Sequence, residues 1–208
     1  MERTEQRRAA IAACVARLRE LEADLGVNEE FLTAAKDEVR GLVDRRELFG
    51  WDEFPRPPEG RRTKLYELSM GDDDRFAVYL MVTNGWMRSR PHDHGTWVVT
   101  AGLAGVEHQR IYARRDDGAG GRRGPLGDEP EPATLEELGR VELGPGVVSA
   151  ILPSGIHSLE IPGDDPSMGL QIYGHALHTL GDRRQFDVKK GWAQPMPTIE
   201  RRIAERAG

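Results

Sequence analysis

Over the first 50 residues, apolar side chains recur at spacings of three and four, with charged residues between them. This period is typical of amphipathic helices. It predicts one helix over residues 2–25, ending at Gly26, and a second that follows the N-cap Asn28 and ends near Phe49 and Gly50. We expect the two helices to form a hairpin that packs on the rest of the chain.

The pattern then changes twice. Residues 51–62 include Pro55, Pro57, Pro58 and Gly60, and are expected to form a linker without regular structure. From Thr63 onward, apolar and polar residues alternate in short runs between Gly- and Pro-containing turns, as in strands with one buried face. We expect strands at 64–68, 75–82, 97–101, 106–113, 141–143, 147–152, 157–161 and 169–173, and an exposed loop at 114–135.

Many short strands between Gly/Pro turns predict a mainly β fold, a barrel or double-stranded jelly roll, preceded by the α-helical hairpin. The length of 208 residues suits one domain with an appendage. The expected divisions are a helical segment at 1–50, the Pro-rich linker at 51–62, the barrel at 63–191 and a C-terminal tail at 192–208.

Charge and cysteine content indicate which kinds of binding partner and which compartment to expect. The formal net charge is −6, so there is no electrostatic case for binding nucleic acid or an anionic membrane. No apolar run approaches the length of a membrane span, and residues 1–8 lack a signal-peptide core. The single cysteine, Cys14, fits a reducing cytoplasm, and we expect it to be buried in the first helix. We expect a cytoplasmic monomer or homodimer that acts on small molecules.

The segment Pro91-His92-Asp93-His94-Gly95-Thr96-Trp97 carries the candidate chemistry. In an extended chain, side chains alternate between two faces, so His92 and His94 point one way and Asp93 the other. Two imidazoles on one strand can hold a transition metal when a third ligand comes from elsewhere. His157, at the head of a later strand-like run, offers that ligand. The sequence therefore predicts a three-histidine metal site inside the barrel.

These motifs resemble those of a known superfamily. Gly85, His92, His94 and Gly105 resemble the first cupin motif, and Gly146, Pro153, Gly155 and His157 the second. Within cupins, residues 91–97 resemble the bacterial thiol dioxygenases of the cysteine dioxygenase type I family, nearest to the 3-mercaptopropionate-type members. So do Gly105-Val106-Glu107 with Tyr112, and Tyr173-Gly174 with Leu177, Leu180, Arg183 and Phe186-Asp187. The resemblance covers about residues 63–191.

The resemblance implies a cupin double-stranded β-helix with one ferrous ion on His92, His94 and His157. It also implies that both atoms of O2 are added to a bound thiolate, giving a sulfinate. Tyr173 matches the active-site tyrosine of the family. The family phrase Ser-x-His-x-Tyr reads Gly169-Leu170-Gln171-Ile172-Tyr173 here, so Gln171 replaces the histidine of the outer proton relay.

Other family positions have changed as well. The cysteine that crosslinks to the tyrosine in animal enzymes falls near Val99, so no crosslink forms. The early-strand arginine that holds the substrate carboxylate falls near Leu68. Arg183 matches the arginine that follows the tyrosine in bacterial members and is expected to bind a carboxylate, with Arg184 as the alternative. Trp97 is the other expected substrate-binding residue, although packing in the wall of the barrel is its simpler role.

Several alternatives stay open. No carboxylate follows His94 at Val98 or Val99, so the three ligands are neutral; they suit Fe(II), and also Zn, Ni or Mn in the protein as isolated. Gln171 and the extra volume left by Gly169 favour a metal-dependent cupin enzyme of different chemistry. A non-catalytic metal- or ligand-binding cupin is the third alternative. We expect the remaining histidines to lie at the surface or a pocket rim: His108, His175 and His178.

Overall fold

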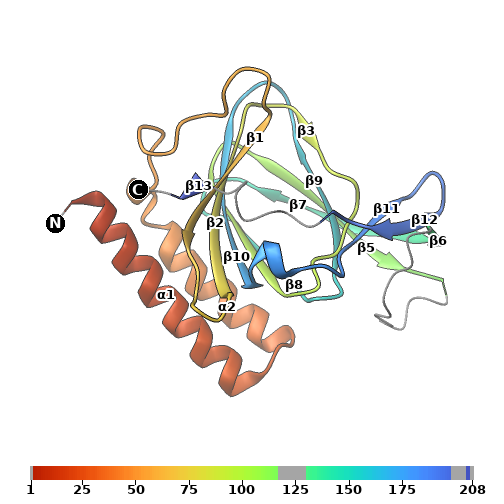
Figure 1. The fold of residues 1–208 in the computed structure, drawn as a ribbon, viewed down its shortest axis with the longest axis horizontal. Helices are drawn as coiled ribbons and strands as arrows, with labels where there is room; N and C mark the ends of the chain where they lie inside the picture. The colour runs from red at the N-terminus through yellow and green to blue at the C-terminus, as the bar shows by residue number, and fades with distance from the viewer. Residues whose placement is uncertain (1, 117–129, 198–204, 207–208) are drawn as a thin grey trace.

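The computed structural model describes residues 2–116, 130–197 and 205–206. Two N-terminal helices are followed by a mainly β body of largely antiparallel strands (Figure 1). The helices are α1 (Arg3–Leu25) and α2 (Glu29–Val43), and the short 3-10 helices are η1 (Arg46–Leu48) and η3 (Leu177–Thr179). No helix within the described ranges is both long and apolar enough to cross a membrane.

Asn28 caps α2 as expected, because its side chain accepts a hydrogen bond from the backbone N–H of Phe31 at 2.9 Å. The helix ends at Val43, earlier than the sequence pattern indicates. Leu48 and Phe49 are nevertheless buried in the same core. The apolar spacing continues past Val43 because the 3-10 turn η1 also buries its apolar residues in this core. The spacing alone therefore did not show where the helix ends.

The strands form three sheets. Their bounds are β1 (Thr63–Ser69), β2 (Arg75–Thr83), β3 (Met87–Arg88), β4 (Val98–Ala104), β5 (Glu107–Arg114), β6 (Glu131–Pro132), β7 (Leu135–Leu143), β8 (Val148–Ile151), β9 (Ile156–Ile161), β10 (Ser167–His175), β11 (Arg184–Asp187), β12 (Trp192–Pro195) and β13 (Glu205–Arg206). The sheet orders are β13-β1-β2-β10-β4-β8, β3-β9-β5-β7 and β11-β12-β6. A closed barrel is not shown by this order and stays a prediction.

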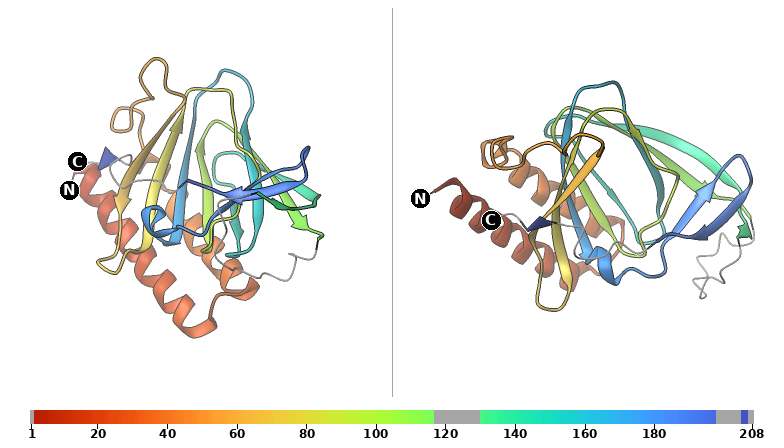
Figure 2. Two further views of the ribbon diagram at one scale, coloured as in Figure 1. Left: turned by 45° about the vertical axis from the view of Figure 1, so that its right-hand side comes forward. Right: turned by 45° about the horizontal axis from the view of Figure 1, so that its top comes forward.

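Figures 1 and 2 show the four-stranded sheet facing the six-stranded sheet, with the helices on the outer side of the latter. Strands β2, β4 and β10 are therefore covered on both faces, and each is almost wholly buried. One set of alternate residues, including Leu80, Val99 and Leu170, packs with the helices. The other set, including Tyr79, Val98 and Tyr173, faces the space between the sheets.

Two of the predicted segments lie partly outside the residues that the structure describes. The predicted loop at 114–135 includes 117–129, and the predicted tail includes 198–204 and 207–208, all outside the described residues. Within the tail, β12 pairs with β11 and β6, and β13 pairs with β1. Strand β7 starts earlier than expected. The added part of the strand is mostly charged and exposed, so it lacks the apolar alternation by which the other strands were predicted. It pairs with β5, and Glu137 forms an ion pair with Arg110 of that strand at 3.3 Å.

Cys14 is buried in α1, as expected. Burial raises the pKa of its thiol to about 12, so the thiolate does not form at neutral pH.

The helical hairpin should contribute strongly to the stability of the β body. Phe31 of α2 is fully buried, and its ring packs edge-on against Trp97, whose centroid lies 5.1 Å away. Phe31→Ala should lower the free energy of unfolding by about 3–5 kcal/mol, measured by urea denaturation. Val27→Ala, at a half-exposed turn position, is the control and should change it by less than about 0.5 kcal/mol. Equal effects would mean that the hairpin is only an appendage.

Candidate metal centre

The three predicted ligands come from two segments that pair through their backbones. His92 and His94 lie in the extended connection between β3 and β4, and His157 lies in β9. The backbone N–H of His92 donates to the carbonyl of His157 at 2.8 Å, and that of His157 donates back at 3.0 Å. This bridge places residues distant in sequence side by side, and with them their imidazoles.

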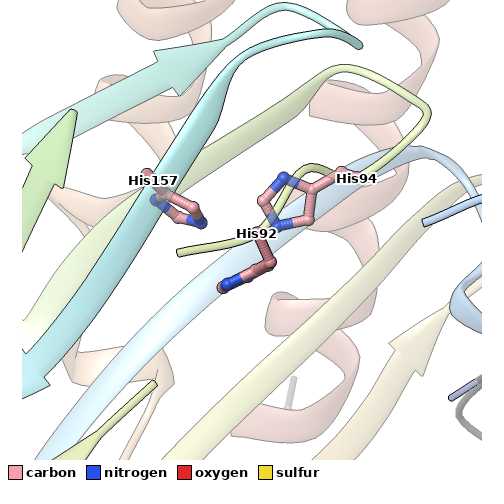
Figure 3. A group of neighbouring side chains, drawn as sticks. All are labelled: His92, His94 and His157. Atoms are coloured by element: carbon pink, nitrogen blue, oxygen red, sulfur yellow. The ribbon is translucent and has the colours of Figure 1, made fainter. Parts of the chain in front are cut away.

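The three imidazoles converge on one point (Figure 3). One nitrogen from each ring lies within 4.8 Å of the others, and all three residues are buried. The Nδ1 atom of His92 lies 2.9 Å from the carbonyl oxygen of Arg90, which fixes its tautomer and leaves Nε2 for a ligand. Neither ring nitrogen of His157 has a hydrogen-bond partner among the described residues. A transition metal would satisfy one buried nitrogen of each imidazole.

Burial also sets the protonation state of the ligands. Desolvation lowers the pKa of His92 to about 4, and it lowers the pKa of His157 well below the usual value. Both imidazoles are therefore neutral at pH 7, which is the form that binds a metal. The donor set of three neutral imidazoles fits Fe(II) as well as Zn, Ni or Mn.

A cavity of about 580 Å3 lies beside this centre, between the six-stranded sheet and β9. Its inner wall includes His92, Gln171, Tyr173 and Arg183. Gln171 and Tyr173 occupy alternate positions of β10 and face the same way, as the period-two pattern predicted. The structure thus brings these predicted site residues together around one space.

Tyr173 is held by its neighbour on the strand. Its hydroxyl donates a hydrogen bond to Oε1 of Gln171 at 3.2 Å, and its ring centroid lies 5.5 Å from that of His94. Burial raises the pKa of Tyr173 to about 12, although the nearby Arg183 acts in the opposite direction. The phenol is therefore protonated at neutral pH and serves as a donor. Gln171 can orient it but cannot accept a proton as a histidine would.

Arg183 is the other polar group of the inner wall. It precedes β11 and is buried, with only 3% of its surface exposed. Its Nε and Nη1 atoms have no hydrogen-bond partner in the part of the chain that the structure describes. It lines the same cavity as His92, and its positive charge adds to the lowering of the pKa of His92 and His157. An unpaired buried guanidinium is costly and indicates a site for an anion.

Arg184, the alternative to Arg183, has a structural place instead. Its backbone N–H donates to Oδ1 of Asp93 at 2.8 Å, and its guanidinium lies 3.7 Å from Glu131. Asp93 thus points away from the histidine pair and serves a hydrogen bond, as predicted.

Trp97, expected to bind substrate, lies in the main core. It packs against Phe31 and Phe76, and its indole N–H donates to Glu22 of α1 at 2.8 Å. It is absent from the described lining of the 580 Å3 cavity. Trp97 shares the helix-facing side with Val99 and Ala101, since side chains two residues apart along an extended chain point the same way.

Gly169 also lies apart from the main cavity. It lines a separate pocket with Thr100, Glu107 and Ser167, which holds about 10 Å3, close to the volume of one water probe. The extra volume expected from this glycine therefore does not enlarge the main cavity. Val99 is fully buried on the helix-facing side, so a side chain there would point away from Tyr173.

The other histidines are peripheral. His108 lies 3.6 Å from Glu142 on the exposed surface of the ladder, His178 lies 3.4 Å from Asp74, and His175 is exposed.

The sequence reasoning missed Glu107, a carboxyl group buried in β5. It accepts a hydrogen bond from the side chain of Gln109 at 2.7 Å. Desolvation nevertheless raises its pKa to about 7. Period two in β5 places Glu107 and Gln109 on one face, and that alternation was the available signal. The sequence of β5 alone could not show that this face is buried in the interior.

No family model matches the sequence, and no match is found among curated proteins. Solved structures that share part of the fold include a hydroquinone 1,2-dioxygenase in complex with Cd2+ and 4-hydroxybenzonitrile, with 11% identity over 57% of this chain and 68% of that chain and a TM-score of 0.40. A cupin superfamily protein from Desulfitobacterium hafniense matches with 14% identity over 63% and 87% and a TM-score of 0.38. An oxalate decarboxylase matches with 18% identity over 57% and 27% and a TM-score of 0.40. At these values the likeness identifies neither a family nor a reaction for this chain.

The buried Glu107 should make stability fall as pH rises. Its pKa is raised on folding, so the unfolded chain releases the proton near pH 4.5 while the folded chain keeps it until about pH 7. The free energy of unfolding is then reduced between these values, with a full penalty of about 3 kcal/mol above pH 7.

Glu107→Gln keeps an oxygen acceptor for Gln109 and removes this penalty. The variant should be more stable than the natural protein at pH 8.5 and about equally stable at pH 4, measured by urea unfolding. The control, Glu47→Gln, removes a carboxyl group that is 68% exposed and should leave the pH profile unchanged. A Glu107→Gln profile parallel to that of the natural protein would disprove the assignment.

Proposed function

We propose that the chain is a cupin-type, non-haem iron-dependent thiol dioxygenase that oxidises a small mercapto-carboxylate to its sulfinate. The overall change adds both oxygen atoms of one O2 to the sulfur of a thiolate, RS⁻ + O2 → RSO2⁻, and needs no further reductant. The observation that carries the proposal is the unpaired, buried guanidinium of Arg183 in the same cavity as His92 and Tyr173. The family resemblance of the sequence motifs supports it.

His92, His94 and His157 would hold the ferrous ion. The ion supplies the redox chemistry by which oxygen is added to sulfur. Because all three ligands are neutral and Arg183 is cationic, the site is suited to a substrate with two negative charges, a thiolate and a carboxylate.

The chain's own residues have three roles in this proposal. Arg183 binds the carboxylate through its planar guanidinium and so sets where the sulfur lies. Tyr173 is protonated, and its single O–H, which donates to Oε1 of Gln171 in the empty site, would turn to donate to the bound substrate. The burial of these groups keeps bulk water away from the thiolate and strengthens both contacts.

Gln171 keeps a second candidate open, because it takes the place of a residue that could exchange a proton. The second candidate is a metal-dependent cupin enzyme with different chemistry, and a non-catalytic metal-binding cupin is the third. The cytoplasmic location is also part of the proposal, and it rests on a single, buried cysteine in a chain of this length.

Oxygen consumption tests the reaction directly. After anaerobic loading with Fe(II), the protein should consume one O2 for each 3-mercaptopropionate and release the sulfinate, as quantified by mass spectrometry. His157→Ala removes a ligand and should lower both the iron content and the oxygen uptake to background. His108→Ala, at an exposed position away from the site, is the control. An iron-loaded protein that consumes no oxygen with any small thiol would favour the second or third candidate.

Arg183 should decide which thiols are accepted. Arg183→Gln should lower kcat/KM for 3-mercaptopropionate by about tenfold to a hundredfold, as expected when charge-assisted hydrogen bonds are lost. The same variant should change kcat/KM far less for 2-mercaptoethanol, which has no carboxylate. Arg184→Gln is the neighbouring control and should retain the preference for the acid. A loss of preference in Arg184→Gln alone would reassign the role to that residue.

A further inference from the structure

The charge of the 580 Å3 cavity is one-sided. Four of the residues that line it are cationic: Arg56, Arg61, Lys64 and Arg183. None of its described lining residues is Asp or Glu. The whole chain is acidic, with a formal net charge of −6, so this excess of positive charge is local to the cavity. A cavity lined by one sign of charge attracts ligands of the opposite sign.

The cationic residues lie at two depths. Arg183 is almost fully buried beside His92 and Tyr173. Arg56 and Arg61 are exposed and lie in the segment before β1, while Lys64 is partly buried at the start of that strand. One wall of the cavity thus has a guanidinium at the metal centre, and the opening has further cations that are accessible from solvent.

The opening is fixed in place, although the sequence predicts an irregular linker there. The hydroxyl of Tyr66 donates to the carbonyl of Pro55 at 2.9 Å. The side-chain amide of Asn84 donates to the carbonyl of Pro57 at 2.8 Å. The backbone of Asn84 also donates to the carbonyl of Arg62 at 2.9 Å. These bonds tie the segment that holds Arg56 and Arg61 to β1 and to the end of β2.

The cavity is also larger than a short thiol requires. A volume of about 580 Å3 lies within the range of pockets that hold drug-sized ligands, roughly 300–1,000 Å3. A three-carbon mercapto acid that reaches Arg183 and the metal ligands fills only its inner part. The outer part is bordered by Arg56 and Arg61 and would be left to water.

From this arrangement we propose that the cavity opening is a second carboxylate subsite, formed by Arg56 and Arg61 with Lys64. The substrate class is then a thiol dicarboxylate: one carboxylate binds Arg183 beside the metal centre, and the other binds the guanidinium groups at the opening. This inference rests on the proposed function for the inner end of the substrate, and it adds the recognition of the outer end.

Calorimetric binding of carboxylates without a thiol tests the outer subsite independently of turnover. The full chain, loaded with Fe(II) under anaerobic conditions, is titrated with linear dicarboxylates from succinate to suberate and with monocarboxylates of equal chain length. At one length, the dicarboxylate should bind at least about tenfold more tightly, which corresponds to two or three exposed ion pairs. Because exposed charges are screened, this ratio should shrink between about 20 mM and about 500 mM salt.

A pair of matched double variants tests whether the arginines at the opening cause the preference for dicarboxylates. In Arg56→Gln/Arg61→Gln the ratio of dicarboxylate to monocarboxylate affinity should fall to about threefold or less, since both exposed guanidinium groups are lost and only the partly buried Lys64 remains. In the control Arg45→Gln/Arg46→Gln, which removes two exposed arginines outside the cavity, the ratio should persist. Circular dichroism confirms that each variant is folded, and the salt dependence of the natural protein tests the same point without any substitution.

The outcomes separate the two proposals. Equal affinity for both acids in the natural protein, or a ratio that persists in Arg56→Gln/Arg61→Gln, overturns the outer subsite. When the outer subsite is overturned in either way, loss of monocarboxylate binding in Arg183→Gln would still support Arg183 as the carboxylate-binding residue of the proposed function. If no carboxylate of either kind binds the natural protein, the role of Arg183 and the outer subsite are both overturned.

Discussion

The short extended segment from Pro91 to Gly95 is the part on which the rest of the site depends. Its backbone pairs with His157 on one side, and Asp93 accepts from and donates to Arg184 on the other. The N–H of Phe186 also donates to the carbonyl of Pro91 at 2.8 Å. One segment therefore sets the position of the third histidine and of the strand that follows Arg183. All of these bonds except the one to the Asp93 carboxylate join backbone groups, so they hold the segment in register whatever the metal content.

The buried sheet explains why this segment can be held so firmly. Strands β4 and β10 pair along most of their length, and both faces of that pair are covered. On the helix side the alternating residues are aliphatic and pack with α2. On the inner side the same strands carry Gln171 and Tyr173 into the cavity. The helices thus cover the outer face of the sheet and leave its inner face for polar groups.

Local patterns predicted the parts of the site that depend on a single strand. Alternation placed His92 and His94 together, and it placed Gln171 and Tyr173 on one inner face. His157 was proposed as the third ligand from its place at the head of a later strand-like run, but only the structure shows that this run pairs with the His92 segment. Arg183 needed the motif resemblance, because its distance in sequence says nothing about its neighbours. Arg56 and Arg61 could not be assigned to the cavity at all. Their place is set by hydrogen bonds from Tyr66 and Asn84, which join segments that no periodicity links.

The protonation states of the buried groups determine the net charge around Arg183. The desolvated histidines stay neutral, the tyrosine stays protonated, and the nearby Glu107 holds its proton up to about pH 7. None of these groups supplies a full negative charge to Arg183 in neutral or mildly acidic solution. The uncompensated guanidinium destabilises the empty protein, and an anion that pairs with it recovers that free energy on binding.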